Sequence, residues 1–320
     1  MVRNRKFSLY IAFSIIGILH AFSQKKVVAY EILKVNKSVS EGFSYPYLLY
    51  IPNSLTKSEK RSDITLLVVP NNTGTVNDTL QFHEAVARKQ LLIWAKFANR
   101  LNTAVLMPIF PRPKKDVLVY THALDRDVMI SEKEEFKRLD LQLIAMIDHS
   151  TKELAGRNIK KKKKVWMAGF SASGMFVNRF TFMHPDQVGA AAIGSPGGWP
   201  IVPIAQFQNQ SLRYPIGISD ISSIAGEKIN FQKLQKTPLF IYMGDEDHND
   251  SVVYADGYEK EDKELIFELF GETPLERWNL IQDFYQQEKL QASFKLYPGV
   301  KHTINNDMIA DVVSFFNANN

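Results

Sequence analysis

The sequence predicts one doubly wound α/β domain, with a mostly parallel sheet and helices on both faces. Strand-like and helix-like patterns alternate along the chain, which is the first observation behind this prediction. The second is size, because 320 residues suit a single unit of this class and can bury a sizeable core. The third is composition, since 45% of the residues are hydrophobic and 23% are charged, as in ordinary globular proteins.

Short apolar runs bounded by turn residues mark the expected strands. The run 64–69 is apolar except at Thr65 and stops at Pro70, as a buried central strand would. The full set of expected strands covers 27–35, 45–51, 64–69, 103–109, 164–169, 188–194, 238–244 and 292–297.

Helical periodicity fills most of the intervals between these strands. The expected helices cover 82–101, 131–151, 172–184, 274–289 and 306–317. Ser131 and Glu134 form a capping-box pattern that places the start of the second helix at residue 131. The segment 195–236 has four prolines and little periodicity, so we expect a short inserted cap over the carboxyl edge of the sheet.

The amino terminus has the pattern of a secretory signal peptide. Residues 1–6 are basic, 7–22 are mostly apolar, and Ala21 and Ser23 are small residues at the positions that precede a cleavage site. His20 interrupts an apolar stretch that is already short for a membrane span. We therefore expect removal of residues 1–23 and export of a single catalytic domain, residues 24–320, to a periplasm or beyond the cell. The alternative is an uncleaved membrane anchor.

Charge and cysteine content exclude several classes of function. The formal net charge is +5, and five lysines run from Lys160 to Lys164. No aromatic residues interleave with these lysines, so we expect a solvated loop and no nucleic-acid partner. The absence of cysteine excludes disulfides, thiolate catalysis and cysteine-ligated metals.

The sharpest motif is the run Gly169-Phe170-Ser171-Ala172-Ser173-Gly174 between a predicted strand and a predicted helix. A nucleophile elbow needs this context, with small residues two positions before and two after the serine. Gly169 and Ser173 occupy those positions. Such a turn exposes the Ser171 hydroxyl above the sheet and directs the backbone N–H of Ala172 at a developing oxyanion. The alternative is an ordinary turn rich in glycine and serine.

A serine hydroxyl needs a base to act as a nucleophile at neutral pH. Of seven histidines, only His302 follows the last predicted strand and precedes the last helix. The loop 244–250 follows another strand and offers Asp245, Glu246, Asp247 and Asp250 as candidate acids. Because the carboxyl ends of parallel strands meet at one edge of the sheet, we expect Ser171, one of these acids and His302 to converge. His248 lies among the same acids, but we expect an acid loop there and no metal site.

These three loops resemble those of the α/β-hydrolase superfamily, and in particular its exported esterase and polyester-depolymerase-like branches. The resemblance covers residues 45–317 and implies that Asp247 is the acid, since members carry Gly-x-x-Asp after this strand. It also implies a second oxyanion donor in the loop after the third strand, here 69–74, which lacks the His-Gly-Gly run of many members. We expect the backbone N–H of Asn72 to serve, with Asn71 and Thr73 as equal alternatives. The resemblance implies no cofactor.

Three further residues are candidates for substrate binding. The segment 110–127 is similar to one in bacterial members of the superfamily that have no assigned substrate, and it places His122 and Arg126 near the expected active-site edge. Arg126 would meet a substrate carboxylate, or else form an internal Arg–Asp pair that fixes the loop. Trp199 follows another strand and would form a flat apolar wall for an acyl group, or else is simply buried.

The sequence therefore predicts an exported serine hydrolase that cleaves a small-molecule or polymer carboxylic ester through an acyl-enzyme on Ser171. A serine peptidase of the same fold and a non-catalytic binding protein on a hydrolase scaffold are the alternatives. The sequence does not define the acyl group, the leaving group or the oligomeric state.

Overall fold

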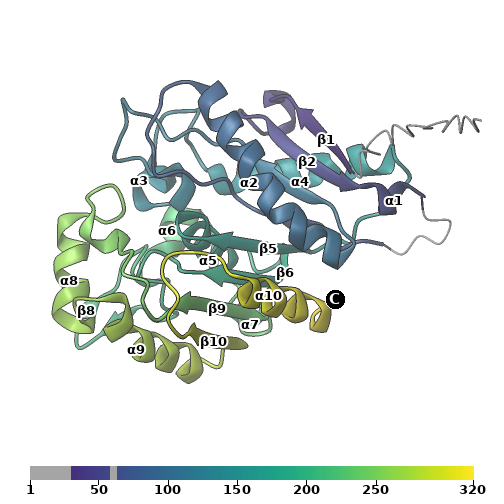
Figure 1. The fold of residues 1–320 in the computed structure, drawn as a ribbon. Helices are drawn as coiled ribbons and strands as arrows, with labels where there is room; N and C mark the ends of the chain where they lie inside the picture. The colour runs from purple at the N-terminus through teal and green to yellow at the C-terminus, as the bar shows by residue number, and fades with distance from the viewer. Residues whose placement is uncertain (1–29, 58–62) are drawn as a thin grey trace, which may run out of the picture.

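An eight-stranded sheet forms the centre of the molecule, which we describe from a computed structural model over residues 30–57 and 63–320. The strand order is β1-β2-β4-β3-β5-β6-β9-β10 (Figure 1). Only β2 runs antiparallel to its neighbours, and the pairs from β4 to β10 are parallel. The strands are β1 (Tyr30–Val35), β2 (Tyr47–Pro52), β3 (Leu67–Val68), β4 (Val105–Pro108), β5 (Val165–Phe170), β6 (Val188–Gly194), β9 (Leu239–Gly244) and β10 (Ala292–Tyr297). The prediction of a mostly parallel α/β fold is confirmed.

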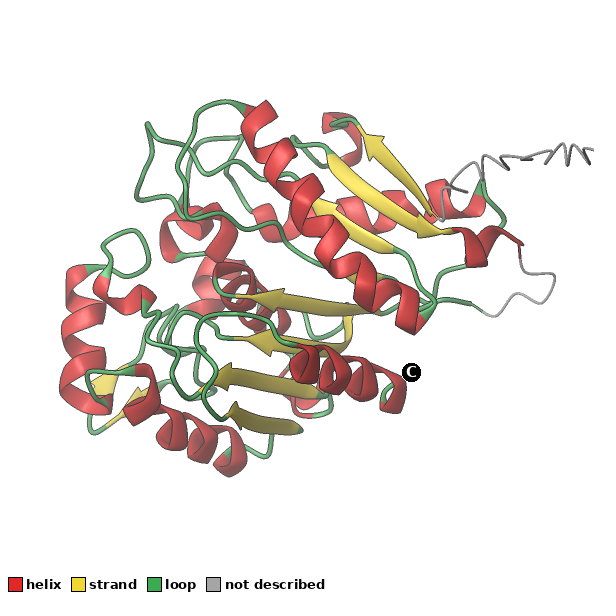
Figure 2. Ribbon diagram, viewed as in Figure 1, coloured by secondary structure: helices red, strands yellow, loops and turns green. Residues whose placement is uncertain are grey.

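Helices cover both faces of the sheet and bury two separate cores (Figure 2). One face carries α2 (Leu80–Leu101) and α10 (Asn306–Ala318), whose apolar residues join a single cluster. The other face carries α4 (Leu139–Ala155), α5 (Ala172–Met183) and α9 (Pro274–Gln287). Successive strand residues point to opposite faces, so Leu67 packs in the α2 cluster and Val68 in the α4 cluster. The central strands are therefore apolar on both sides, as their sequence indicates.

The helix expected at 131–151 begins later than its capping-box pattern suggests. Arg126–Ile130 forms a separate short helix, α3, and α4 starts at Leu139 after Arg138, which has φ 51°. Residues 132–135 are all exposed, so a helix there would bury nothing against the sheet. The predicted start at Ser131 is wrong because tertiary burial begins only at Phe136 and Leu139.

The segment 195–236, expected as a short cap, begins at the carboxyl edge of the sheet, where the Ser195 N–H donates to the Tyr242 carbonyl at 2.7 Å. It contains the hairpin of β7 (Gln206–Phe207) and β8 (Gln210–Ser211), then α6 (Ile221–Ala225) and α7 (Phe231–Gln235). Its side chains pack against α8 (Lys260–Phe270), a helix that the sequence reading did not predict; Phe207 contacts both Phe270 of α8 and Phe284 of α9. Figure 1 shows β8, α8 and α9 together at one end of the molecule.

Short helical turns complete the described chain: η1 (Val39–Glu41), α1 (Asn53–Lys57), η2 (Thr121–Ala123) and η3 (Ser251–Val253). Within the described ranges, no helix has the length and apolarity needed to cross a membrane. The predicted signal peptide, 1–23, lies outside the described residues.

Candidate active site

Ser171 occupies a sharp turn between β5 and α5. Its backbone has φ 62° and ψ −131°, a conformation that non-glycine residues rarely adopt and that concentrates at functional sites. The turn is so tight that a Cβ on Gly169 would lie 2.2 Å from the Ser173 carbonyl oxygen. The Ser173 hydroxyl accepts a hydrogen bond from the Phe170 N–H and donates one to the Phe170 carbonyl, each at 2.9 Å. The Ser173 side chain therefore stabilises the turn around Ser171.

His302 and Asp247 form a hydrogen-bonded pair. His302 Nδ1 lies 2.9 Å and 3.1 Å from the two oxygens of Asp247. The Asp247 side chain is 1% exposed and that of His302 is 31% exposed. Burial alone would raise the pKa of Asp247, but the hydrogen bonds from His302 and from the Asn249 N–H hold that pKa below its ordinary value. An ionised Asp247 keeps the proton on Nδ1 and leaves Nε2 as an acceptor.

The loop that carries Asp247 is joined directly to the loop that carries His302. A Cβ on Gly244 would lie 1.8 Å from the Val300 carbonyl oxygen, so the two backbones are in contact there. The Asp245 N–H donates to the Tyr297 carbonyl and the Glu246 N–H donates to the Val300 carbonyl, both at 3.1 Å. These contacts fix the position of His302 relative to Asp247.

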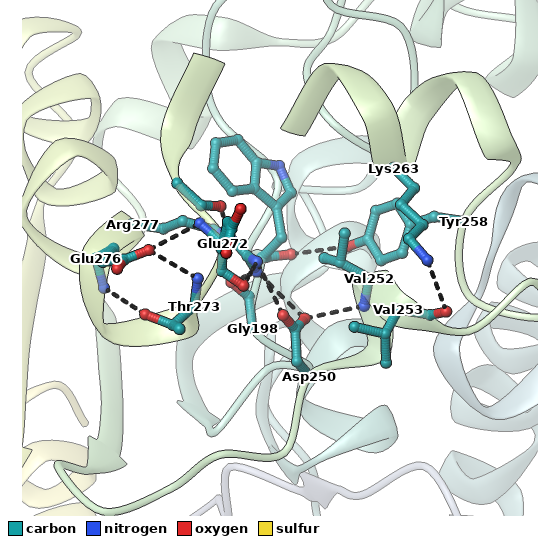
Figure 3. A network of polar contacts seen from close by, with 12 residues as sticks. Gly198, Asp250, Val252, Val253, Tyr258, Lys263, Glu272, Thr273, Glu276 and Arg277 are labelled. Atoms are coloured by element: carbon teal, nitrogen blue, oxygen red, sulfur yellow. Dashed lines mark hydrogen bonds and ion pairs between the residues drawn. The ribbon is translucent and has the colours of Figure 1, made fainter. Parts of the chain in front are cut away.

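The other aspartates of the acid loop have different partners. Asp245 accepts a hydrogen bond from the Gly299 N–H at 2.7 Å. Asp250 forms a bidentate ion pair with Arg277 at 2.8 Å and 3.2 Å (Figure 3). Of the three candidate aspartates, Asp247 is the one whose carboxylate is hydrogen-bonded to His302.

Ser171 and His302 line one open cavity of about 760 Å³. No hydrogen bond joins these two residues, both of which lie in the described part of the chain. Such a gap is common in free enzymes, because catalytic hydrogen bonds are often long before substrate binds. Most side chains in the walls carry a polar group: Asn72, Thr73, Gln90, Arg112, Tyr120, Asn249, Ser251, Tyr254, Asp256 and Thr303. Ile93, Phe170 and Ile304 are aliphatic or aromatic without one, and polar and apolar atoms share the wall surface about equally. No residue of 195–236 lines this cavity.

The loop after β3 is held by side chains from two other segments. The Asn72 N–H donates to Gln90 Oε1 at 2.9 Å, and Gln90 Nε2 donates to the Asn72 carbonyl. The Thr73 N–H donates to His122 Nδ1 at 3.2 Å. Both N–H groups already have acceptors, so the expectation that the Asn72 backbone supplies an oxyanion donor is corrected. The Ala172 N–H, at the first position of α5, has no intrahelical acceptor, as for all first-turn donors.

His122 supports this loop and does not face the cavity. Its side chain is fully buried, and its Nε2 donates to the Phe110 carbonyl at 2.8 Å. Burial lowers the pKa of His122 to about 3, so the ring is neutral at physiological pH. The prediction that His122 contacts substrate is wrong, because the loops around it exclude solvent.

Arg126 and Trp199 also lie outside the cavity. Arg126 pairs with Asp220 at 2.8 Å and donates to the Tyr214 carbonyl at 2.8 Å, which is the internal Arg–Asp alternative. Trp199 is 0% exposed, and its ring stacks on Phe270 with centroids 4.5 Å apart. Neither residue binds substrate in this arrangement, because ion pairing and packing occupy them.

Arg112 is a cavity residue to which the sequence reading gave no role. Its guanidinium lies 3.9 Å from the centre of the Tyr120 ring, pairs with Asp256 and donates to the Thr73 carbonyl at 3.0 Å. The sequence signal for a role at the active-site edge was its position between Pro111 and Pro113, just beyond a predicted strand. Sequence alone does not reveal Asp256 as its partner, because that residue follows β9.

The strand order, the turn at Ser171 and the His302–Asp247 pair define an α/β-hydrolase fold. No protein-family model and no curated protein sequence matches the chain. Among solved structures, poly(aspartic acid) hydrolase-1 from Sphingomonas sp. KT-1 is similar, with a TM-score of 0.58 and 17% identity over 89% of this chain and 96% of that one. A poly(3-hydroxybutyrate) depolymerase from Bordetella parapertussis has a TM-score of 0.55 and 17% identity over 90% of this chain and 89% of its own.

Proposed function

We propose that this protein is a serine hydrolase that cleaves carboxylic esters through an acyl-enzyme on Ser171. One observation carries the proposal: Ser171, in a strained elbow turn, shares a cavity with His302, whose Nδ1 is held by the buried carboxylate of Asp247. A nucleophile, a base and a group that orients the base are the parts that acyl transfer to water requires.

The proposed reaction has two steps that use the same groups. His302 Nε2 takes the Ser171 proton as Oγ attacks the ester carbonyl, and the Ala172 N–H donates to the oxyanion. His302 then gives that proton to the leaving alcohol as the C–O bond breaks. In the second step His302 deprotonates a water, which attacks the acyl-enzyme, and His302 then returns that proton to Ser171 Oγ as the acyl C–Oγ bond breaks and the acid leaves. Asp247 stabilises the imidazolium in both steps.

The polar groups in the cavity walls support a substrate with polar atoms near the reacting centre. Its walls offer amide, hydroxyl and phenol groups from Asn249, Thr303, Tyr120 and Tyr254 and only a few apolar side chains. The two similar structures are named for action on poly(aspartic acid) and on poly(3-hydroxybutyrate). We therefore propose short or hydroxylated acyl groups, on a small molecule or on a polymer, as the substrates of this site.

Hydrolysis of an amide by the same groups is the second candidate. It is favoured by the likeness to the structure named for poly(aspartic acid), because the backbone of that polymer is a polyamide. Parallel assays with short peptides and with short esters separate the two bond types.

We also propose that the chain is exported and that residues 1–23 are removed. The support is the basic, then apolar, then small-residue pattern of that segment. The test is the intact mass of the protein recovered from an envelope or culture fraction. An amino terminus at Gln24 supports export, whereas an uncleaved chain in the membrane fraction supports an anchor.

The first experiment is hydrolysis of p-nitrophenyl esters, from acetyl to palmitoyl, by residues 24–320 and by Ser171→Ala. The parent should hydrolyse short esters and label with a fluorophosphonate, and the variant should do neither. Equal activity in the variant would remove Ser171 as the nucleophile. A parent that labels but cleaves no ester would favour the amide substrate, and a parent that does neither would favour a binding protein.

A further inference from the structure

We propose that the side-chain amide of Asn72, and not a backbone N–H of its loop, is the second oxyanion donor, and that Gln90 positions it. This inference rests on the proposed function. It assigns to Asn72 Nδ2 the task that this fold usually gives to a backbone group.

Two backbone donors of this loop that line the cavity, those of Asn72 and Thr73, already have acceptors. Gln90 Oε1 accepts from the Asn72 N–H, and His122 Nδ1 accepts from the Thr73 N–H. His122 is fully buried, and its low pKa keeps the ring neutral and Nδ1 able to accept. Turning the Thr73 N–H toward a substrate would leave the buried His122 Nδ1 without its hydrogen bond, at a cost of about 1–3 kcal/mol.

The Asn72 side chain lies beside the nucleophile. Its Nδ2 donates to the carbonyl oxygen of Phe170 at 3.1 Å, and Phe170 directly precedes Ser171. Asn72 is half-buried and lines the cavity that holds Ser171 and His302. An asparagine amide has two N–H bonds. The second bond of Asn72 has no acceptor within residues 30–57 and 63–320, so it is free for a substrate oxygen.

This placement puts one donor on each side of the nucleophile along the chain. The Ala172 N–H follows Ser171 at the start of α5, and Asn72 Nδ2 is tied to the residue before Ser171. In this proposal, the oxyanion that forms when Ser171 attacks a carbonyl accepts hydrogen bonds from both donors. Preorganised donors of this kind stabilise the transition state without reorganisation at the moment of reaction.

Gln90 supplies the preorganisation. Its amide holds the N–H and the carbonyl of Asn72 at once, and it comes from the middle of α2, a helix of 22 residues. The Asn72 amide is therefore fixed from both ends, through Gln90 at its backbone and through Phe170 at its side chain. Gln90 is a positioning residue, because its own polar atoms are engaged with the loop.

The test compares Asn72→Ala, Asn72→Asp and Gln90→Ala with the parent, using kcat and KM for a short ester and the inhibition constant of a boronic acid. A boronate bound to Ser171 has an oxygen where the oxyanion forms. Asn72→Asp keeps the shape of the side chain and removes both donors. Gln81→Ala is the matched control, because Gln81 is an exposed residue of the same helix.

We expect Asn72→Ala and Asn72→Asp to lower kcat by about 10²–10³-fold, the usual loss for one oxyanion donor, with KM nearly unchanged. Boronate affinity should fall in parallel with kcat. Gln90→Ala should lower both quantities by a smaller factor, Gln81→Ala should lower neither, and thermal unfolding should show that each variant is folded.

Failure of this inference is distinguishable from failure of the proposed function. If Asn72→Ala and Asn72→Asp are folded and keep the parent kcat and boronate affinity while Ser171→Ala is inactive, the amide is not the donor but the serine hydrolase stands. A loss confined to KM would also overturn the inference, since it would show ordinary substrate binding. If Ser171→Ala remains active, the proposed function itself fails.

Discussion

Arg277 holds Asp250 in a bidentate ion pair three residues beyond Asp247. The distances are 2.8 Å and 3.2 Å, and the Arg277 side chain is completely buried. The remaining donors of Arg277 reach the carbonyls of Gly198 and Glu272 (Figure 3) and of Gly271. A single guanidinium thus joins α9, the loop after β6 and the loop that carries Asp247, so it supports the acid without touching it.

Replacement of Arg277 by Met should destabilise the fold strongly. The substitution leaves the Asp250 carboxylate buried without its cation. Removal of one partner from a buried ion pair lowers the free energy of unfolding by about 3–5 kcal/mol. The measurement is urea unfolding followed by circular dichroism. The double variant Arg277→Met/Asp250→Asn should lose less than the sum of the single variants, because it leaves no unpaired charge. Parent-like stability of Arg277→Met would contradict the importance of the pair.

Asp247→Asn should lower kcat by about 10³–10⁴-fold, because an amide no longer fixes the His302 tautomer or stabilises its imidazolium. Asp245→Asn is the control in the same loop, since an asparagine oxygen still accepts the Gly299 N–H. Steady-state kinetics on a short ester provide the measurement. If Asp245→Asn shows the larger loss, the assignment of the acid is wrong.

His122 should make the fold less stable in acid. Its pKa is lowered to about 3 by burial, below the ordinary value of about 6.5, so the unfolded chain binds more protons than the folded chain between these values. Stability from this group is present above about pH 6.5 and is lost as the pH falls. At pH 5 the free energy of unfolding should be about 2 kcal/mol lower than at pH 7 through this group.

The test compares urea unfolding at pH 7 and pH 5 for the parent and His122→Gln. The variant should be less stable at pH 7, where it lacks the native hydrogen bonds of the imidazole. It should lose less free energy of unfolding between the two pH values. An equal decrease in the free energy of unfolding in both proteins would show that groups other than His122 determine stability between pH 7 and pH 5.

Gly169→Ala should impair folding, because the new Cβ would meet the Ser173 carbonyl oxygen at 2.2 Å. Neither backbone segment can yield without moving Ser171 out of its turn. Gly156→Ala is the matched control, since its Cβ would make only ordinary contacts at 3.6 Å and 3.7 Å. Soluble yield and the melting temperature should fall for Gly169→Ala alone, and equal behaviour of the two variants would contradict the tight turn.

The cavity should favour short acyl groups, because few of its side chains lack a polar group. We expect kcat/KM for p-nitrophenyl esters to be highest at acetyl or butyryl and to fall toward palmitoyl, because Ile93, Phe170 and Ile304 are the few apolar side chains available to a long chain. Substrate concentrations below micelle formation make the comparison valid. A rise toward palmitoyl would show that a long acyl group finds apolar surface elsewhere.

The sheet and the meeting of Ser171, Asp247 and His302 could be predicted from sequence because both depend on local patterns. Each of the three residues directly follows a strand, and a parallel sheet brings such positions to one edge. The choice among the aspartates needed the family pattern, since Asp245 and Asp250 have equally suitable positions along the chain.

Side-chain partners across long sequence separations could not be predicted. Trp199 is buried because Phe270, in a helix that the sequence reading missed, stacks on it. The Asn72 N–H is unavailable because Gln90 on α2 accepts from it. Ser131 fails to start a helix because its neighbours have nothing to bury. In each case packing in three dimensions overrode a local preference.

The contact between Gly244 and Val300 joins the loop of the acid to the loop of the base, backbone to backbone. We therefore expect the Asp247–His302 distance to change little between free and acylated protein. For protein engineering, the loops at 244–250 and 298–302 would have to be exchanged together, since a new sequence in either one has to fit the backbone of the other.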